Sequence, residues 1–185
     1  MKDINLFKTK GSIFLKKIST KSELSEDSYD GYLIDSSEKE ARRIIESLKT
    51  KKGVIALVGG DDTFNRRAIE TLKINYLLSP EKKTANNTLK QRDSGLNHVI
   101  AKEAAKRNIT ILIDFAKIQK LSGKEKSLHL EKLIQNIKIC RKAKCKIKIA
   151  SLASNKMEVV DEKSRSAFGV SLGMSSAQAR DSTQF

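Results

Sequence analysis

The chain has 185 residues, of which 38% are hydrophobic and 32% are charged, a balance that suits one soluble domain with a sizeable core. It carries 37 Lys and Arg residues against 22 Asp and Glu, and the resulting net charge of +15 favours a polyanionic partner, namely RNA, DNA or an acidic membrane surface. No apolar run is long enough to span a bilayer and no signal peptide is seen, so we expect no membrane association and a cytoplasmic location.

In the first half of the chain, short apolar and β-branched runs alternate with segments of helical periodicity. The run 53–58 is apolar throughout, which is typical of a strand buried on both faces. Helices are expected after the capping residues Ser36–Ser37 and Asp61–Thr63. The strands predicted in this half are 3–7, 13–18, 32–34, 53–58 and 76–78.

The second half begins with a central helix that follows residue 94, and a longer helix is expected at 124–143. Further strands are predicted at 109–113 and 147–150, and one or two short helices at 164–180, divided near Gly173. The polar residues 175–185 are expected to form a frayed tail.

Strands that alternate with helices through short connections indicate a parallel sheet in a single α/β domain covering 1–185. No glycine-rich dinucleotide fingerprint follows any strand, so a TIM-barrel-like arrangement is preferred over an open doubly wound sheet, which the pattern leaves open. In either arrangement, functional groups gather where the strands end. The polar residues at those ends are Asp35, Gly59 to Asp62, Ser79 to Glu81, Asp114 and Ser151.

The central run is Arg92-Asp93-Ser94-Gly95-Leu96-Asn97-His98-Val99. Asp93 or Ser94 is predicted to cap the helix, whose apolar face continues to Ile100 and beyond. Arg92, Asn97 and His98 near the free amides of the first turn suit an anion or a polar partner. The simpler interpretation, a capped helix with a partly exposed histidine, is favoured by the residues alone.

Charge is unevenly distributed along the chain. Acids outnumber bases in 23–46, whereas 82–107 and 138–148 are basic, and the last of these contains no acid. The basic segments suit a phosphate backbone, although 138–148 is equally well interpreted as a solvated helix end. Aromatic residues make up only 5%, so a bound RNA would be recognised by backbone and shape, not by stacking on its bases.

Catalytic motifs are scarce. The chain has two histidines, of which His129 is expected to be exposed on the long helix, and two cysteines, Cys140 and Cys145, expected to be reduced structural thiols pointing to different sides. The carboxylates at strand ends (Asp35, Asp61, Asp62, Glu81 and Asp114) would have to supply most of any metal site, and helix capping explains them better. No nucleophile elbow, phosphate loop or CxxC pair is present.

The central run, together with Tyr76-Leu77-Leu78-Ser79-Pro80-Glu81, the strand 111–115 and Arg165-Ser166 leading into Leu172-Gly173-Met174, resembles the ribonuclease P protein component 3 family, the archaeal counterpart of a eukaryotic ribonuclease P and MRP subunit. The resemblance covers roughly residues 75–179. The sequence departs from it in two places: 150–154 lacks the usual glycine, and Ala167 stands where a proline often follows the Arg-Ser pair.

The resemblance implies a barrel related to metal-dependent phosphoesterases but without their metal site. It implies a non-catalytic subunit of a ribonucleoprotein endonuclease that removes the 5′ leader from precursor tRNA, with component 2 as protein partner and the catalytic Mg²⁺ held by the RNA. The chain itself would bind no cofactor or metal. A barrel phosphoesterase acting alone is the alternative. We expect five residues to contact phosphates: Lys82, Lys83, Lys90, Arg92 and Arg165. We expect structural or interface roles from four others: Asp93, Ser94, Asn97 and His98.

Overall fold

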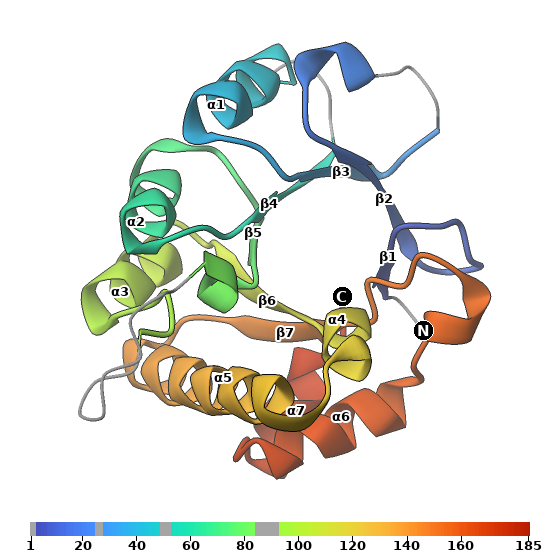
Figure 1. Cartoon of the computed structure of the whole chain (residues 1–185), viewed down its shortest axis with the longest axis vertical. Helices are drawn as coiled ribbons and strands as arrows, with labels where there is room; N and C mark the ends of the chain where they lie inside the picture. The colour runs from blue at the N-terminus through green and yellow to red at the C-terminus, as the bar shows by residue number, and fades with distance from the viewer. Residues whose placement is uncertain (1–2, 25–27, 49–52, 84–92) are drawn as a thin grey trace.

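The computed structural model describes residues 3–24, 28–48, 53–83 and 93–185. Seven strands form one sheet in chain order, and each pairs in parallel with the next. The sheet curves into a nearly closed barrel with helices around its outside (Figure 1). The strands are β1 (Ile4–Asn5), β2 (Ile13–Ile18), β3 (Gly31–Ile34), β4 (Val54–Val58), β5 (Tyr76–Leu78), β6 (Thr110–Asp114) and β7 (Ile147–Ala150). The predicted parallel sheet and the predicted TIM-barrel-like arrangement are confirmed.

Helices follow six of the seven strands, directly or after a short turn. The α-helices are α1 (Glu38–Ser47), α2 (Asp62–Thr71), α3 (His98–Lys106), α4 (Phe115–Lys120), α5 (Gly123–Ala143), α6 (Glu162–Ser171) and α7 (Ser176–Ser182). Short 3-10 turns occur at η1 (Lys21–Glu23), η2 (Pro80–Lys83) and η3 (Lys156–Glu158). Helix α4 is the α-helix that the sequence pattern did not predict.

Two apolar layers hold the barrel together. Alternate strand residues such as Leu33, Val58 and Leu112 pack inside the ring of strands, whereas their neighbours face the helices in a larger outer cluster. Both faces of β4 are therefore covered, which explains why its sequence is apolar throughout.

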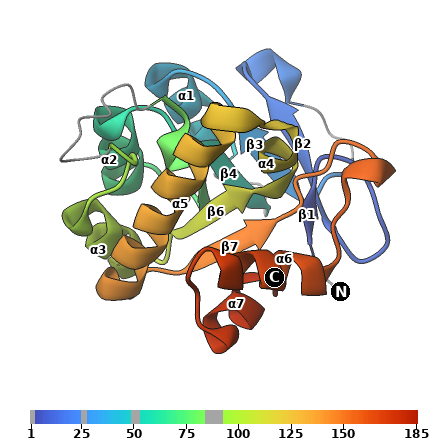
Figure 2. The ribbon, with the colours of Figure 1, turned by 60° about the horizontal axis from the view of Figure 1, so that its bottom comes forward.

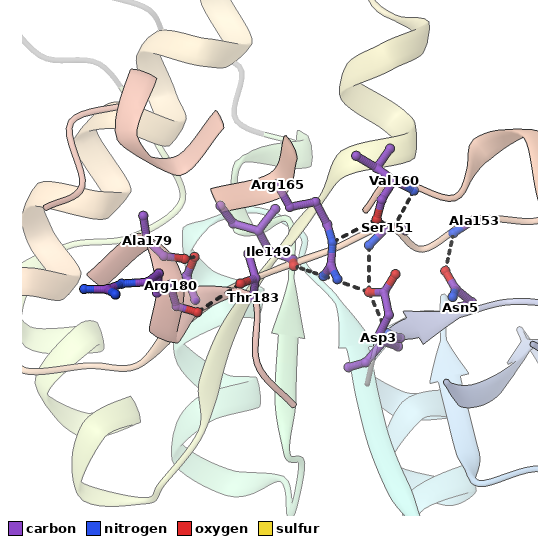
Figure 3. A network of polar contacts seen from close by, with 12 residues as sticks. Asp3, Asn5, Ile149, Ser151, Ala153, Val160, Arg165, Ala179, Arg180 and Thr183 are labelled. Atoms are coloured by element: carbon purple, nitrogen blue, oxygen red, sulfur yellow. Dashed lines mark hydrogen bonds and ion pairs between the residues drawn. The ribbon is translucent and has the colours of Figure 1, made fainter. Parts of the chain in front are cut away.

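The seam between β1 and β7 is closed by residues beyond the strand ends (Figure 3). The Leu152 amide donates to the Ile4 carbonyl oxygen and the Leu6 amide to the Ala153 carbonyl oxygen, each at 2.9 Å. Beside them, Asp3 Oδ1 accepts from the Ser151 amide at 3.1 Å. The first and last strands are thus joined by individual backbone hydrogen bonds and not by regular strand pairing.

The C-terminal segment is ordered into α7 and packs beside α6 and β7 (Figure 2), so the prediction of a frayed tail at 175–185 is wrong. Ala179, Ser182 and Thr183 are fully buried. Arg141 of α5 donates to the Gly173 carbonyl oxygen and to Gln178 Oε1, which fixes the start of α7. The polar composition of residues 175–185 did not predict this packing, because the side chain that anchors the segment, Arg141, belongs to α5.

The two cysteines are buried free thiols, as predicted, but they face each other. Helix α5 ends at Ala143, and Lys144 adopts a left-handed conformation with φ 56°, so the Cys145 amide returns to donate to the Cys140 carbonyl oxygen at 2.9 Å. The hydrogen bond between the thiols raises the pKa of Cys140 and lowers that of Cys145. The prediction that they point apart is wrong because Cys145 lies beyond the helix.

Within the described residues, none of the helices combines the length and the apolar character needed to cross a bilayer.

Candidate nucleic-acid interface

The segment 93–97 is fixed in place by a buried amide on α2. Asn65 is fully buried, and its Nδ2 donates to the carbonyl oxygens of Pro80 at 2.9 Å and Gly95 at 3.0 Å. Its Oδ1 accepts from the Gly60 amide at 2.9 Å. One side chain therefore joins the turns that follow β4 and β5 to the turn that precedes α3.

A second amide holds the same segment from α5. Asn136 is 1% exposed, and its Nδ2 donates to the Ser94 carbonyl oxygen at 3.0 Å. Gly95 lies between the two anchors with φ +72°, and a Cβ atom there would be 2.0 Å from the Pro80 carbonyl oxygen. Only glycine fits this turn, so the conformation of the segment is set by its neighbours on both sides.

Helix α3 begins after this turn. Asn97 is its N-cap, with Oδ1 accepting from the Ile100 amide at 2.9 Å, so the prediction that Asp93 or Ser94 caps the helix is wrong. Asp93 instead accepts from the Gly95 amide at 3.1 Å, and Ser94 is buried. Asn97 and His98 are exposed at the start of the helix, and the structural or interface roles expected for Asp93, Ser94, Asn97 and His98 stay predictions.

The carboxylates at the strand ends act mainly on backbone amides. Asp61 caps α2 and Asp114 caps α4, as predicted. Burial raises the pKa of Asp114, and burial together with the adjoining carboxyl of Asp93 raises that of Asp62. Asp35 forms an ion pair with Lys17 at 3.0 Å. Among the described residues, no group of three or more His, Cys, Asp and Glu side chains is arranged to hold a metal ion.

Glu81 and His129 form a buried pair on η2 and α5. The His129 side chain is only 10% exposed, and its Nε2 lies 3.5 Å from Glu81 Oε1, so the prediction of an exposed His129 is wrong. Burial raises the pKa of Glu81 to about 7 and lowers that of His129 to about 4. Sequence periodicity assigned only one buried face to α5, and η2 covers another.

The predicted RNA contacts have different outcomes. Lys82 and Lys83 belong to η2, but their side chains, and Lys90 and Arg92 altogether, lie outside the described residues, so these contacts stay predictions. Arg165 is fully buried: its Nη1 lies 2.9 Å from Asp3 Oδ1 and donates to the Ile149 carbonyl oxygen at 2.7 Å (Figure 3). The prediction that Arg165 contacts RNA is wrong, because its guanidinium is part of the β1–β7 seam.

Acidic and basic side chains balance on α1 and α2. Arg42 and Arg67 both pair with Glu38, at 3.5 and 3.2 Å, and Arg66 pairs with Glu70 at 2.8 Å. The acidic segment 23–46 is thus partly neutralised by arginines of the same face, and the excess positive charge must lie elsewhere.

Part of that excess lies on the adjoining helices α3 and α5 and the turn into β7 (Figure 1). Arg141 holds α7, and Lys148 lies 3.5 Å from Asp181 Oδ2, so these two cations serve packing. We define the basic flank as the exposed lysines of α3, of the C-terminal end of α5 and of the turn into β7 that have no ion pair within the part of the chain described: Lys102, Lys106, Lys138, Lys142, Lys144 and Lys146.

A parallel barrel with a rigid turn at its C-terminal edge and an excess of lysine on one flank defines an α/β barrel protein suited to a polyanion. A sequence model of the family described as RNase P subunit p30 matches residues 27–184, and the chain belongs to this family. The resemblance stated from the sequence is therefore confirmed.

Three curated relatives, each named ribonuclease P protein component 3, illustrate the match. The protein of Methanothermobacter thermautotrophicus is 28% identical over 82% of this chain and 60% of its own length. The protein of Methanocaldococcus jannaschii is 28% identical over 71% of this chain and 54% of its own length. The protein of Thermococcus gammatolerans is 28% identical over 77% of this chain and 64% of its own length. The chain therefore spans between about half and two thirds of the length of these three relatives.

Solved structures agree on the fold. A chain of an archaeal ribonuclease P with mature tRNA superposes with a TM-score of 0.76 at 21% identity, over 98% of this chain and 87% of that one. An amidohydrolase superposes with a TM-score of 0.59 at 11% identity, over 85% of this chain and 41% of that one. At these identities the likeness is one of fold alone.

Proposed function

We propose that this chain is a protein subunit of ribonuclease P that binds and supports the catalytic RNA in the removal of the 5′ leader from precursor tRNA. The family match over residues 27–184 is the observation that carries the proposal. In this role the subunit is non-catalytic, works in the cytoplasm beside component 2, and leaves the Mg²⁺ chemistry to the RNA.

The basic flank supplies phosphate contacts in this proposal, together with Lys82, Lys83, Lys90 and Arg92. Lysines on α3, α5 and the turn into β7 match a backbone charge without reading bases. Asn65 and Asn136 keep the turn at 93–97 in one conformation, so that Asn97 and His98 are presented at a fixed place beside the flank. A pre-ordered surface loses little conformational entropy on binding.

Reconstitution tests the proposal. Precursor tRNA cleavage is measured with the RNA and component 2, with and without this chain, across Mg²⁺ concentrations. We expect a higher Mg²⁺ requirement and slower cleavage when the chain is left out; an unchanged requirement and rate would refute the proposal.

Charge variants test the basic flank. Lys142→Gln with Lys146→Gln should lower the slope of log affinity against log salt by about 0.7–0.9 per lost phosphate contact. Lys39→Gln, an exposed lysine on the charge-balanced α1, is the matched control and should leave the slope unchanged. Equal slopes for all three proteins would remove these lysines from the interface.

The alternative, a barrel phosphoesterase acting alone, has the amidohydrolase-like fold in its favour. Its test is the purified chain with Mg²⁺ or Mn²⁺ and a phosphodiester substrate. Turnover abolished by Asp114→Asn would favour it. We expect no turnover, because the Asp114 carboxylate already accepts the Lys117 amide at 2.9 Å as a helix cap.

A further inference from the structure

A cavity of about 190 Å³ opens between η2, α4 and α5. It is separate from the turn at 93–97 and from the basic flank. The side chains around it are Glu81, Lys117, Leu121, Glu125, Leu128, His129 and Lys132.

Cationic groups converge on this cavity from two helices. Lys117 comes from α4, and Lys132 and His129 come from α5. All three side chains line the same cavity, and, after desolvation, the charges of Lys117 and Lys132 lower the pKa of His129. Lys117 lines the cavity and is partly buried, and none of the described carboxylates forms an ion pair with it, although its charge lowers the pKa of Glu81 and of Asp114 against the larger effect of burial.

The acidic groups at the cavity offset this charge only in part. Both oxygens of Glu81 are shielded from solvent beneath His129, where Asp114, Lys117 and Ser79 also influence the carboxyl. Since burial brings the pKa of Glu81 to about 7, about half of these carboxyls are neutral at pH 7. Glu125 is exposed at the rim, where solvent screens it.

We propose that this cavity binds a phosphate group, held by the Lys117 ammonium with His129 and Lys132 on the opposite wall. A compact, strongly charged oxyanion suits the point charge of lysine. Leu121 and Leu128 make part of the wall apolar, which strengthens the attraction by lowering the local dielectric constant. The phosphate could belong to an RNA backbone or to a small phosphate compound, and the site does not depend on the proposed function.

The two histidines make the site testable by proton NMR, because the chain has only His98 and His129. Inorganic phosphate is titrated into the intact protein, with sodium chloride at matched ionic strength as control. We expect a saturable shift of the His129 ring protons and a rise of the His129 pKa from about 4, since a bound anion stabilises the imidazolium. The exposed His98 lies outside the cavity lining and reports any general effect of the added salt, so its shift should not follow the His129 binding curve.

Three variants assign the effect. Lys117→Gln should weaken phosphate binding roughly tenfold or more, the usual effect of losing a charged hydrogen-bond partner. Lys117→Arg keeps the charge and should retain binding. Lys124→Gln, an exposed lysine of α5 outside the cavity lining, should bind as the wild type does. Equal affinity in all three would overturn the proposal.

A His129 shift that never saturates, that chloride reproduces, or that His98 matches would also overturn it. The source of the phosphate is decided by repeating the titration with a short RNA in phosphate-free buffer. A His129 shift that inorganic phosphate then reverses identifies an RNA phosphate. Saturable binding of inorganic phosphate with no response to RNA identifies a small phosphate compound, and leaves the proposed function standing on its own tests.

Discussion

The buried pair between Arg165 and Asp3 should dominate the stability of the β1–β7 seam. Replacing Arg165 by methionine keeps an unbranched side chain of similar length but removes the 2.9 Å contact to Asp3 and the 2.7 Å hydrogen bond to Ile149. It leaves a carboxylate buried without its cation and a carbonyl oxygen without its donor. Breaking a buried pair in this way costs about 3–5 kcal/mol.

Urea unfolding of the intact chain measures this loss as a change in the free energy of unfolding. Arg180→Met, at an exposed position of α7, is the control and should cost less than about 0.5 kcal/mol. The double variant Asp3→Leu with Arg165→Met should be more stable than Arg165→Met alone, because the unpaired buried charge is gone. A loss for Arg165→Met no larger than that of the control would refute the assignment of Arg165 to the seam.

RNA affinity separates the structural role of Arg165 from the contact predicted from the sequence. At a temperature where Arg165→Met is still folded, its affinity for RNA should equal that of the wild type, since the guanidinium is 0% exposed. A shallower salt dependence in the folded variant would restore Arg165 to the interface.

Three further outcomes follow from the turn at 93–97 and the Glu81–His129 pair. Gly95→Ala should lower stability by more than about 2 kcal/mol in urea unfolding, because φ is +72° and the new methyl group would overlap the Pro80 carbonyl; a loss below about 1 kcal/mol would mean the turn adapts. Asn136→Leu should cost about 1–3 kcal/mol by leaving the Ser94 carbonyl without its donor, and hydrogen exchange should accelerate locally at the start of α3; uniform acceleration would contradict this local role. Against pH, the raised pKa of Glu81 (about 7) makes stability fall as pH rises from about 4.5 to 7, and the lowered pKa of His129 (about 4) makes it rise from about 4 to 6.5. The two effects on stability offset each other in the wild type. His129→Gln should therefore lose stability as pH rises, and Glu81→Gln should gain it; parallel stability profiles for the two variants would refute the opposite pKa shifts of Glu81 and His129.

The strands were predictable because each is a short apolar run bounded by turn or capping residues. Ser37, Asp61 and the helix 123–143 follow from rules that act within a few residues. Helix α4 was not predicted because its six residues are too few to display a helical period. Its N-cap, Asp114, was the available signal, and the same residue also ends a strand.

Other failures concern contacts between distant parts of the chain. Arg165 looked like a surface cation because its partner, Asp3, lies at the opposite end of the sequence. His129 looked exposed because nothing local shows that η2 covers it. Asn65 and Asn136 were missed, although Asn136 sits between Leu133 and Ile137 on an apolar helix face, and a polar residue there signals a buried hydrogen bond.

The C-terminal edge of the strands is where parallel barrels place their reacting groups. Here Asp61 and Asp114 accept backbone amides, and Asn65 joins three turns through their carbonyl and amide groups. These hydrogen bonds hold the edge in one conformation. Because the Asp61 and Asp114 carboxylates already accept backbone amides, they are less available as metal ligands. Much of the excess positive charge outside this edge lies on the outer elements α3 and α5, where it meets a large partner more readily than a small substrate. This division between a rigid edge and a charged flank is what a scaffold for RNA requires, and it supports a subunit role over an independent hydrolase.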